Sequence, residues 1–296
     1  MYLFHRIEEL ASSRDATRHA IGSFILKEHA SLQDYTIDDI ARLTFTSKAS
    51  VTRFAKALGY DGWRSFLHGF IREESYEEKH ASDIDVNRPF APGDSDALIA
   101  EKIGDLKAET IADTFANLDR GMLSMAVRRL EASKSVTVFG LSPHCYSAGL
   151  FCRKMTSIGM PANVVPSGEF GLTAGALGPK DCAILISYSG DNADENPMKQ
   201  VPLLQENKVQ LIALTSGGHN YLREQIPCTL TISSRERLYS KIATFATEES
   251  VAYLLDVLFS CYFARNYEAN YERKLQGSIR LEDVRRAALK EIREQQ

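Results

Sequence analysis

Between residues 133 and 233, short apolar runs rich in β-branched residues alternate with stretches of helical periodicity. The runs are SVTVFG, ANVVP, DCAILIS, VQLIALT and CTLTIS, and few charges interrupt them. Strands that are apolar on both faces and separated by helices form a parallel sheet with helices on each side. The sequence therefore predicts an α/β domain with a mostly parallel sheet in a three-layer α/β/α arrangement.

A second kind of sequence precedes this domain. Residues 17 to 70 show the periodicity of short helices, which predicts an all-α domain. The stretch 73–96 has eight acidic residues, two basic residues and two prolines, a net charge of −6 that is typical of a linker. A chain of 296 residues is also long enough for two cores. We expect an all-α domain over 1–76, a linker over 77–97, an α/β domain over 98–270 and a charged helical tail over 271–296.

The net charge of the whole chain argues against a nucleic-acid partner, but its distribution argues for one. Lys and Arg number 35 against 39 Asp and Glu, a formal charge of −4. The window from Arg42 to Arg64 nevertheless has five basic residues and one acidic residue, a net charge of +4. A local basic window of this kind is a candidate phosphate-binding surface.

The five cysteines show neither a CxxC pair nor the spacing of a zinc site with histidine. Each lies in an apolar stretch, so we expect buried thiols in a reducing compartment and neither a metal nor a cofactor. The N-terminus lacks the apolar core of a signal peptide, and no stretch has the roughly 20 apolar residues of a membrane span. The expectation is a cytoplasmic protein with no membrane partner.

The sharpest local signal is TIDDIARLTFTSKASVTRFAKALGYDGWRSF, residues 36 to 66. Thr36 and Asp39 have the spacing of a capping box at the start of one helix. Ser47 can cap a second helix that ends before Gly59. The pattern predicts two short helices joined by a tight turn.

The second helix is amphipathic, with one apolar face and one polar face. Val51, Phe54, Ala55 and Leu58 share an apolar face, while the opposite face is basic and rich in hydroxyls. Such a face suits the major groove, where short polar side chains reach base edges and cations hold phosphates. The candidate DNA-binding residues are Ser47, Lys48, Ser50, Thr52, Arg53 and Lys56. The alternative is a helical hairpin whose basic face is merely solvated.

The layout IA…S…VTRFAK-LGY-GW resembles the helix-turn-helix domain of RpiR-type transcriptional regulators. The resemblance implies that double-stranded operator DNA is a partner. One departure lies in the turn, where the family usually has Gly and this chain has Phe45. We therefore expect Phe45 to adopt a backbone conformation that glycine adopts at lower cost.

Small polar residues follow the predicted strands, and the loop Ser187-Tyr188-Ser189-Gly190 is the clearest case. It follows DCAILIS and precedes a helix predicted to begin near Glu195. Hydroxyls, backbone N–H groups and a helix N-terminus at the carboxyl end of a parallel strand form a phosphate site. The alternative is an ordinary capping turn, since SxSG alone is a weak motif.

The block from Ser133 to about Asn270 resembles a sugar isomerase (SIS) domain, which in RpiR-type regulators follows the helix-turn-helix and binds a phosphosugar. Ser187 and Ser189 match the phosphate-binding serines of the family, while Asn192 stands where a threonine is usual. In the first loop Gly140 is kept, but Ser142 and His144 replace the usual glycine and serine. The resemblance thus implies these effector-binding residues: Gly140, Ser142, His144, Ser187, Ser189, Gly190 and Asn192.

An isomerase would also need a base that moves a proton between sugar carbons. The candidates are Glu169, Glu248, Glu249, His144 and His219, and none lies in a motif that assigns it this role. We therefore expect no catalytic residue and no enzyme, but a regulator of carbohydrate metabolism that senses a phosphorylated sugar as a homodimer or tetramer. The alternatives are a phosphosugar isomerase and a regulator with a vestigial or non-sugar pocket.

Overall fold

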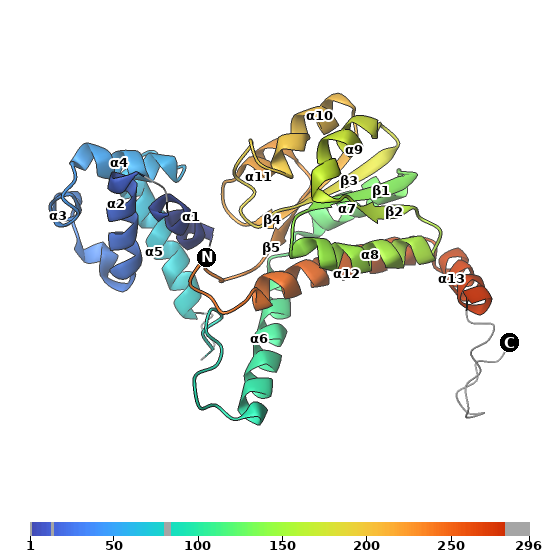
Figure 1. The fold of residues 1–296 in the computed structure, drawn as a ribbon, viewed down its shortest axis with the longest axis horizontal. Coiled ribbons are helices and arrows are strands. Elements are labelled where there is room, and N and C mark those ends of the chain that lie inside the picture. The colour runs from blue at the N-terminus through green and yellow to red at the C-terminus, as the bar shows by residue number, and fades with distance from the viewer. Residues whose placement is uncertain (1, 13–14, 80–83, 282–296) are drawn as a thin grey trace.

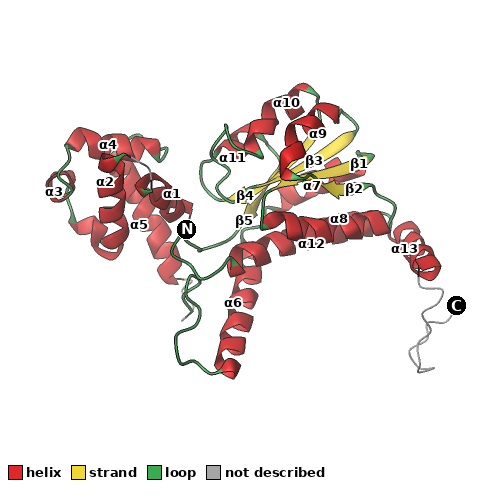
Figure 2. Cartoon of the chain, in the orientation of Figure 1, coloured by secondary structure: helices red, strands yellow, loops and turns green. Residues whose placement is uncertain are grey.

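The structure, a computed structural model, describes residues 2–12, 15–79 and 84–281. Figure 1 shows an N-terminal helical unit beside an α/β unit, and Figure 2 shows that the strands all lie in the second. The N-terminal helices are α1 (Tyr2–Ala11), α2 (Ala16–Lys27), the 3₁₀ helix η1 (His29–Asp34), α3 (Ile37–Leu43), α4 (Lys48–Ala57) and α5 (Trp63–Lys79).

One apolar core holds the N-terminal helices together. It contains Phe54 from α4 and Phe66 and Phe70 from α5, all nearly inaccessible to solvent. Leu3, Phe4 and Ile7 of α1 complete it, although α1 lies before the region whose periodicity predicted helices. The DNA-binding candidates of α4 are thus carried by a helix whose other face is buried.

Two long helices connect this unit to the sheet. They are α6 (Asp96–Ala116), which projects away from the sheet in Figure 1, and α7 (Arg120–Glu131). The expected domain boundary at residue 76 falls within α5, and that at residue 271 falls within α13 (Tyr267–Leu281). The remainder of the expected tail, 282–296, lies outside the described residues.

The sheet has five parallel strands in the order β2-β1-β3-β4-β5. The strands are β1 (Ser135–Gly140), β2 (Ala162–Val164), β3 (Asp181–Ile186), β4 (Gln210–Ser216) and β5 (Thr229–Ile232). The remaining helices are α8 (His144–Ser157), α9 (Phe170–Ala176), α10 (Val201–Glu206), α11 (Tyr221–Gln225), α12 (Phe245–Arg265) and two 3₁₀ turns, η2 (Ser167–Glu169) and η3 (Met198–Gln200). The expected α/β/α sheet is confirmed.

Successive residues of β3 contribute to two separate cores. Ile184 and Ile186 pack on the face covered by α7, α8 and α12. Ala183 and Leu185 pack on the opposite face, against α9, α10 and α11. This two-sided burial is why the strands read as continuous apolar runs rather than as alternating ones.

The cysteines divide into two groups. Cys152, Cys182 and Cys228 are buried, whereas Cys145 and Cys261 are partly exposed. The expectation that every thiol is buried is therefore wrong for these two, because they lie on faces of α8 and α12 that the chain itself does not cover completely. Burial raises the pKa of Cys152 and of Cys182 to about 12.

We expect a thiol reagent at pH 8 to modify Cys145 and Cys261 of the native protein and to leave Cys152, Cys182 and Cys228 unmodified. The thiolate is the reacting species, and burial opposes its formation at the last three residues. Mass spectrometry of the labelled protein measures this, with urea-unfolded protein as the control in which all five cysteines react. Rapid labelling of Cys182 in the native protein would contradict the packing described above.

Candidate functional site

The turn between α3 and α4 has the geometry that the sequence predicts. Thr36 and Asp39 form a reciprocal capping box, with Asp39 N to Thr36 Oγ1 at 3.2 Å and Thr36 N to Asp39 Oδ2 at 3.1 Å. Phe45 has φ of +53°, which confirms its expected left-handed conformation, and its side chain is 97% exposed. Ser47 Oγ accepts a hydrogen bond from Ser50 N and caps α4.

Hydrogen bonds to Thr36 lower the pKa of Asp39 below its ordinary value. A carboxylate with a depressed pKa stabilises the fold above the ordinary Asp pKa, and this stabilisation is lost as the pH falls through the lowered value. We expect Thr36→Ala to raise the pKa of Asp39 toward its ordinary value, as measured by NMR titration of the carboxyl carbon. Asp94, whose pKa is lowered by its bond to Lys102, is the internal control and should not change.

The six candidate DNA-binding residues lie at the start and on the outer face of α4, opposite Val51 and Phe54. Lys48, Arg53 and Lys56 are exposed, and Ser50 and Thr52 are half-buried. Several of these groups already have local partners: Lys48 pairs with Asp38, Arg53 Nη2 donates to Ser50 Oγ at 2.9 Å, and Thr52 Oγ1 donates to Lys48 O at 3.0 Å. Their role toward DNA stays a prediction.

The sheet register places the two candidate anion-binding loops side by side. Gly140 at the end of β1 pairs with Ile186 at the end of β3. The loop Gly140–His144 and the loop Ser187–Asn192 therefore leave the same edge of the sheet from neighbouring strands. Convergence at this edge is the usual arrangement of ligand sites in open α/β sheets.

His144 begins α8 and contacts a carboxylate from a distant part of the chain. Its Nδ1 lies 2.9 Å from Glu248 Oε1, in the first turn of α12. Ser147 Oγ donates to the other oxygen of Glu248 at 3.3 Å. The sequence indicated both groups as candidates, but only the structure shows that they are partners.

The loop after β3 is held by its own hydroxyls and by a glycine. Ser187 Oγ accepts a hydrogen bond from Gly190 N at 3.2 Å. Gly190 has φ of +62° and lies against buried Thr215 and Asn220, and its carbonyl accepts from Leu222 N. The loop thus has a defined shape before any ligand binds.

The helical segment expected to begin near Glu195 is present but begins later, so its predicted start is wrong. The chain enters η3 at Met198 and α10 only at Val201. Pro197 disfavours helical backbone at Asn196, while Pro202 is accepted in the first turn of α10. An anion at this loop would therefore be held by hydroxyls and turn N–H groups rather than by the end of a helix that begins near Glu195.

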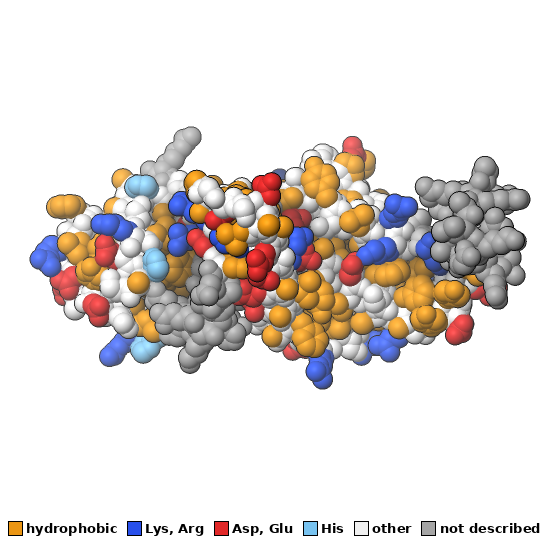
Figure 3. Space-filling model, turned by 90° about the horizontal axis from the view of Figure 1, so that it is seen from below, with side chains coloured by type: hydrophobic (Ala, Val, Ile, Leu, Met, Phe, Trp, Pro, Cys, Tyr) orange, Lys and Arg blue, Asp and Glu red, His pale blue; other side chains and the backbone are white. Residues whose placement is uncertain are grey.

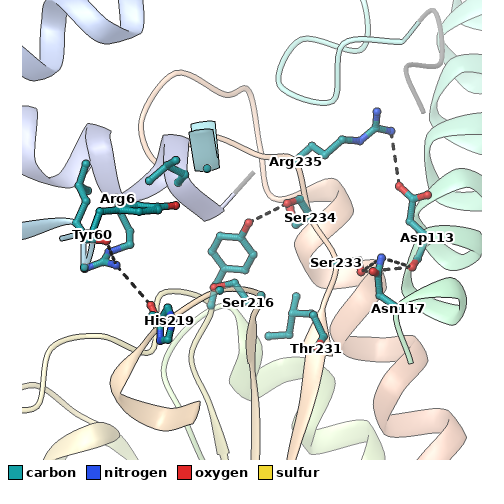
Figure 4. A pocket seen from close by; sticks show the side chains of 18 of the residues that line it. Arg6, Tyr60, Asp113, Asn117, Ser216, His219, Thr231, Ser233, Ser234 and Arg235 are labelled. Atoms are coloured by element: carbon teal, nitrogen blue, oxygen red, sulfur yellow. Dashed lines mark hydrogen bonds and ion pairs between the residues drawn. The ribbon is translucent and has the colours of Figure 1, made fainter. Parts of the chain in front are cut away.

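A cavity of about 780 Å³ lies between the helical unit and the carboxyl edge of the sheet. Its lining includes Arg6 and Tyr60 from the helical unit and Tyr188, Ser216 and His219 from the α/β unit (Figure 4). Among the described residues, none of the seven candidate effector-binding residues lines it, although Tyr188 lies between two of them.

The cavity lining mixes apolar side chains with polar and charged ones, and some of its charges are compensated. Tyr188 OH donates to Ser234 O at 2.8 Å, and Arg235 pairs with Glu109 and lies 3.9 Å from Asp113. Ser216 Oγ is buried and has no protein hydrogen-bond partner within the described ranges. Small polar residues after the strands are visible in the sequence, but a cavity whose walls come from two units is not.

Glu236 is a buried carboxylate that the sequence did not indicate as a candidate. It is 1% exposed and accepts hydrogen bonds from Ala246 N, Thr247 N and Thr247 Oγ1. The carboxylate therefore caps the N-terminus of α12, where a negative charge is favourable. Glu236 and α12 together fix the loop after β5.

The part of the chain that the structure describes contains no cluster of three or more His, Cys, Asp or Glu side chains placed to hold a metal ion. Nor does any helix within those ranges have the length and apolar character needed to cross a membrane.

Comparison with known proteins identifies both units. Residues 1–75 match the model of the helix-turn-helix domain of the rpiR family, and residues 129–254 match the SIS domain. An uncharacterized HTH-type transcriptional regulator of Caldanaerobacter subterraneus is 23% identical over 262 residues, 88% of this chain and 90% of that protein. One from Haemophilus influenzae is 21% identical over 260 residues, 87% and 88% of the two chains.

Solved structures share the fold. Vibrio vulnificus NanR complexed with ManNAc-6P superposes with a TM-score of 0.61 at 18% identity, covering 96% of this chain and 100% of that one. The sugar isomerase domain of an RpiR transcription factor from Sphaerobacter thermophilus gives 0.53 at 16% identity, covering 61% and 98%. The protein thus combines a helix-turn-helix domain with a SIS domain, the architecture of a transcriptional regulator. It belongs to the RpiR-type family of transcriptional regulators.

Proposed function

We propose that the protein binds operator DNA through α4 and binds a phosphorylated sugar at the loops after β1 and β3, and that the sugar alters DNA binding. The observation that carries this proposal is the placement of two polar loops, Gly140–His144 and Ser187–Asn192, at one edge of the SIS sheet. In DNA binding, Ser47, Ser50 and Thr52 supply hydroxyls near base edges, and Lys48, Arg53 and Lys56 hold phosphates.

A solved relative supports the chemical class of the effector. Vibrio vulnificus NanR, whose match covers 96% of this chain, is complexed with ManNAc-6P. In this chain Ser187, Ser189 and Asn192 supply hydroxyl and amide groups for a phosphate, which N–H groups of the turn supplement. The regulated genes are then those of carbohydrate metabolism.

We further propose a homodimer formed through helices of the SIS domain. Phe115 of α6 is 60% exposed, and Tyr146 and Leu150 of α8 are 71% and 62% exposed. Figure 3 shows hydrophobic side chains gathered on the underside of the molecule, the face on which α8 and α12 lie in Figure 1. A second copy of the chain would cover such a surface. Binding of the dimer to two successive major-groove faces then requires its two recognition helices to lie roughly 34 Å, or a multiple of it, apart.

Fluorescence anisotropy with DNA from upstream of the gene tests the DNA-binding part, and thermal shift with a panel of sugar phosphates tests the effector part. We expect salt-sensitive, sequence-preferring binding and stabilisation by a sugar phosphate without its turnover. Binding that shows no sequence preference contradicts the regulator. Stabilisation by no sugar phosphate contradicts the effector and favours a pocket that is vestigial or specific for another ligand.

One observation favours a second function, a phosphosugar isomerase. The His144–Glu248 pair lies where the candidate loop Gly140–His144 ends, and it has the composition of an acid–base pair. If the protein is an isomerase, it will interconvert a ketose phosphate and an aldose phosphate, and Glu248→Gln will abolish the turnover. Absence of turnover with a sugar phosphate that stabilises the protein excludes this function for that ligand.

A further inference from the structure

Helix α1 belongs to the core of the helix-turn-helix domain but also contacts the SIS domain. Leu3, Phe4 and Ile7 are buried in the helical core. Arg6 and Glu8 of the same helix reach across to loops of the SIS domain. Because α1 is anchored in one domain and bonded to the other, its polar residues help to hold the two domains together.

Arg6 binds the C-terminal end of the recognition helix α4. Its Nη1 donates to Leu58 O at 2.8 Å and its Nη2 to Ala57 O at 3.2 Å. The last carbonyls of a helix carry partial negative charge and lack partners within the helix, so a guanidinium there stabilises the helix end. Arg6 thereby caps the helix that presents Arg53 and Lys56.

The same guanidinium also pairs with the candidate effector loop. Arg6 Nε lies 2.9 Å from Asp191 Oδ2, with the two side chains only 14% and 25% exposed. Asp191 lies between Gly190 and Asn192, two of the residues assigned to the effector site. Arg6 Nη1 also lies 3.5 Å from His219 O, and Figure 4 shows the two residues side by side. One side chain therefore connects the end of the recognition helix to the loop in which we place the phosphate.

A phosphate group bound at this loop would be a second anion beside Asp191. It would repel the Asp191 carboxylate and compete with it for the Arg6 guanidinium, which prefers planar contacts with oxyanions. Partial burial makes this competition stronger than it would be in water. The bound and unbound loops thus differ in how strongly they hold Arg6, and this difference is what an effector needs to shift a domain arrangement.

We propose that Arg6 is the positioning residue through which the effector loop controls the recognition helix. This inference rests on the proposed function, since it assigns the regulation of the same ligand site. In this structure Arg6 joins the end of α4 to Asp191. Anion binding at Ser187–Asn192 loosens this junction and releases the helix-turn-helix domain to another orientation.

Glu8 provides a matched control. Its carboxylate is 7% exposed and accepts hydrogen bonds from Leu238 N and from Ser240 Oγ, the latter at 3.1 Å. This second bridge joins the same two domains but ends on the loop between β5 and α12. Glu8→Gln disturbs an interdomain contact without touching the effector loop, so it should retain the response to effector.

The test uses full-length protein, fluorescent DNA from its own promoter region and the same panel of sugar phosphates. Anisotropy measures the DNA affinity of the wild type, Arg6→Ala, Asp191→Asn, the double variant and Glu8→Gln, each with and without the sugar phosphate that stabilises the wild type. Thermal shift on the same samples measures sugar-phosphate binding separately. Asp191→Asn leaves the Arg6 contacts to α4 intact, so the comparison does not depend on the folding of Arg6→Ala.

We expect the wild type and Glu8→Gln to change DNA affinity on effector binding by a factor in the range of about 5 to 150. Arg6→Ala and Asp191→Asn should still bind the sugar phosphate but change DNA affinity by less than about twofold, with no further loss in the double variant. Full response in either single variant overturns the role of Arg6 and leaves the proposed function standing.

If no sugar phosphate binds the wild type, the proposed effector is wrong. The connection of Arg6 to Asp191 is then tested by the DNA affinities of the variants without effector. Non-additive effects of Arg6→Ala and Asp191→Asn, by at least about threefold, then support the connection between the loop and α4. Additive effects overturn it.

Discussion

The double variant Arg53→Ala/Lys56→Ala will bind operator DNA about 10- to 100-fold more weakly than the wild type at low salt, while its fold remains intact. Both side chains are exposed on α4, and neither takes part in the buried core formed by Val51 and Phe54. If each holds one phosphate, the slope of log affinity against log salt concentration becomes shallower by about two.

Lys180→Ala/Lys199→Ala is the matched control for this experiment. It removes the same charge from exposed positions of the SIS domain. Anisotropy over a range of salt concentrations should give the wild-type slope for this control. An unchanged slope in the Arg53/Lys56 variant would place the DNA on another surface of the protein.

Gly190→Ala will destabilise the protein by about 2–4 kcal/mol, because the new side chain has neither the space nor the backbone conformation that it needs. Gly190 has φ of +62°, and a Cβ there would lie 2.4 Å from Thr215 Oγ1 and 3.0 Å from Asn220 Oδ1. Both neighbours are buried and hydrogen-bonded to each other, so they cannot move aside freely. Urea denaturation measures the loss in the free energy of unfolding.

Gly104→Ala is the control for glycine replacement as such. Gly104 lies in α6, where a Cβ would meet nothing within 4 Å. Alanine in a helix is favoured over glycine, so this variant should be more stable by about 0.5–1 kcal/mol. Wild-type stability of Gly190→Ala would show that the loop after β3 adopts a different conformation from the one described.

Local sequence signals predicted those features whose causes are local. The capping box of Thr36 and Asp39 and the Ser47 cap were predictable because each depends on residues within one turn. The left-handed Phe45 was predictable from the resemblance, since RpiR-type regulators usually have glycine at this position. The parallel sheet was predictable because buried strands need apolar residues on both faces. The predicted start of a helix near Glu195 was wrong, because Pro197 disfavours helical backbone at Asn196 and the chain becomes helical only from Met198.

The sequence also indicated candidate residues without their partners. His144 and Glu248 were each named as candidates, but their contact depends on how α8 and α12 pack on the sheet. The burial of Glu236 likewise depends on α12 and could not be inferred from a charged stretch in a loop. The DNA-binding and effector-binding residues themselves remain predictions for the experiments above.

The sequence by itself determined two domains of different architecture and a net charge of −4 that conceals a basic window of +4 from Arg42 to Arg64. Both features follow from the composition and periodicity of short segments, which can be read without knowing which distant residues come into contact. Only the tertiary structure decided that Arg6 meets both the end of α4 and Asp191. These contacts join residues that are far apart in the sequence. Only the packing of α1 between the two domains brings them within hydrogen-bonding distance.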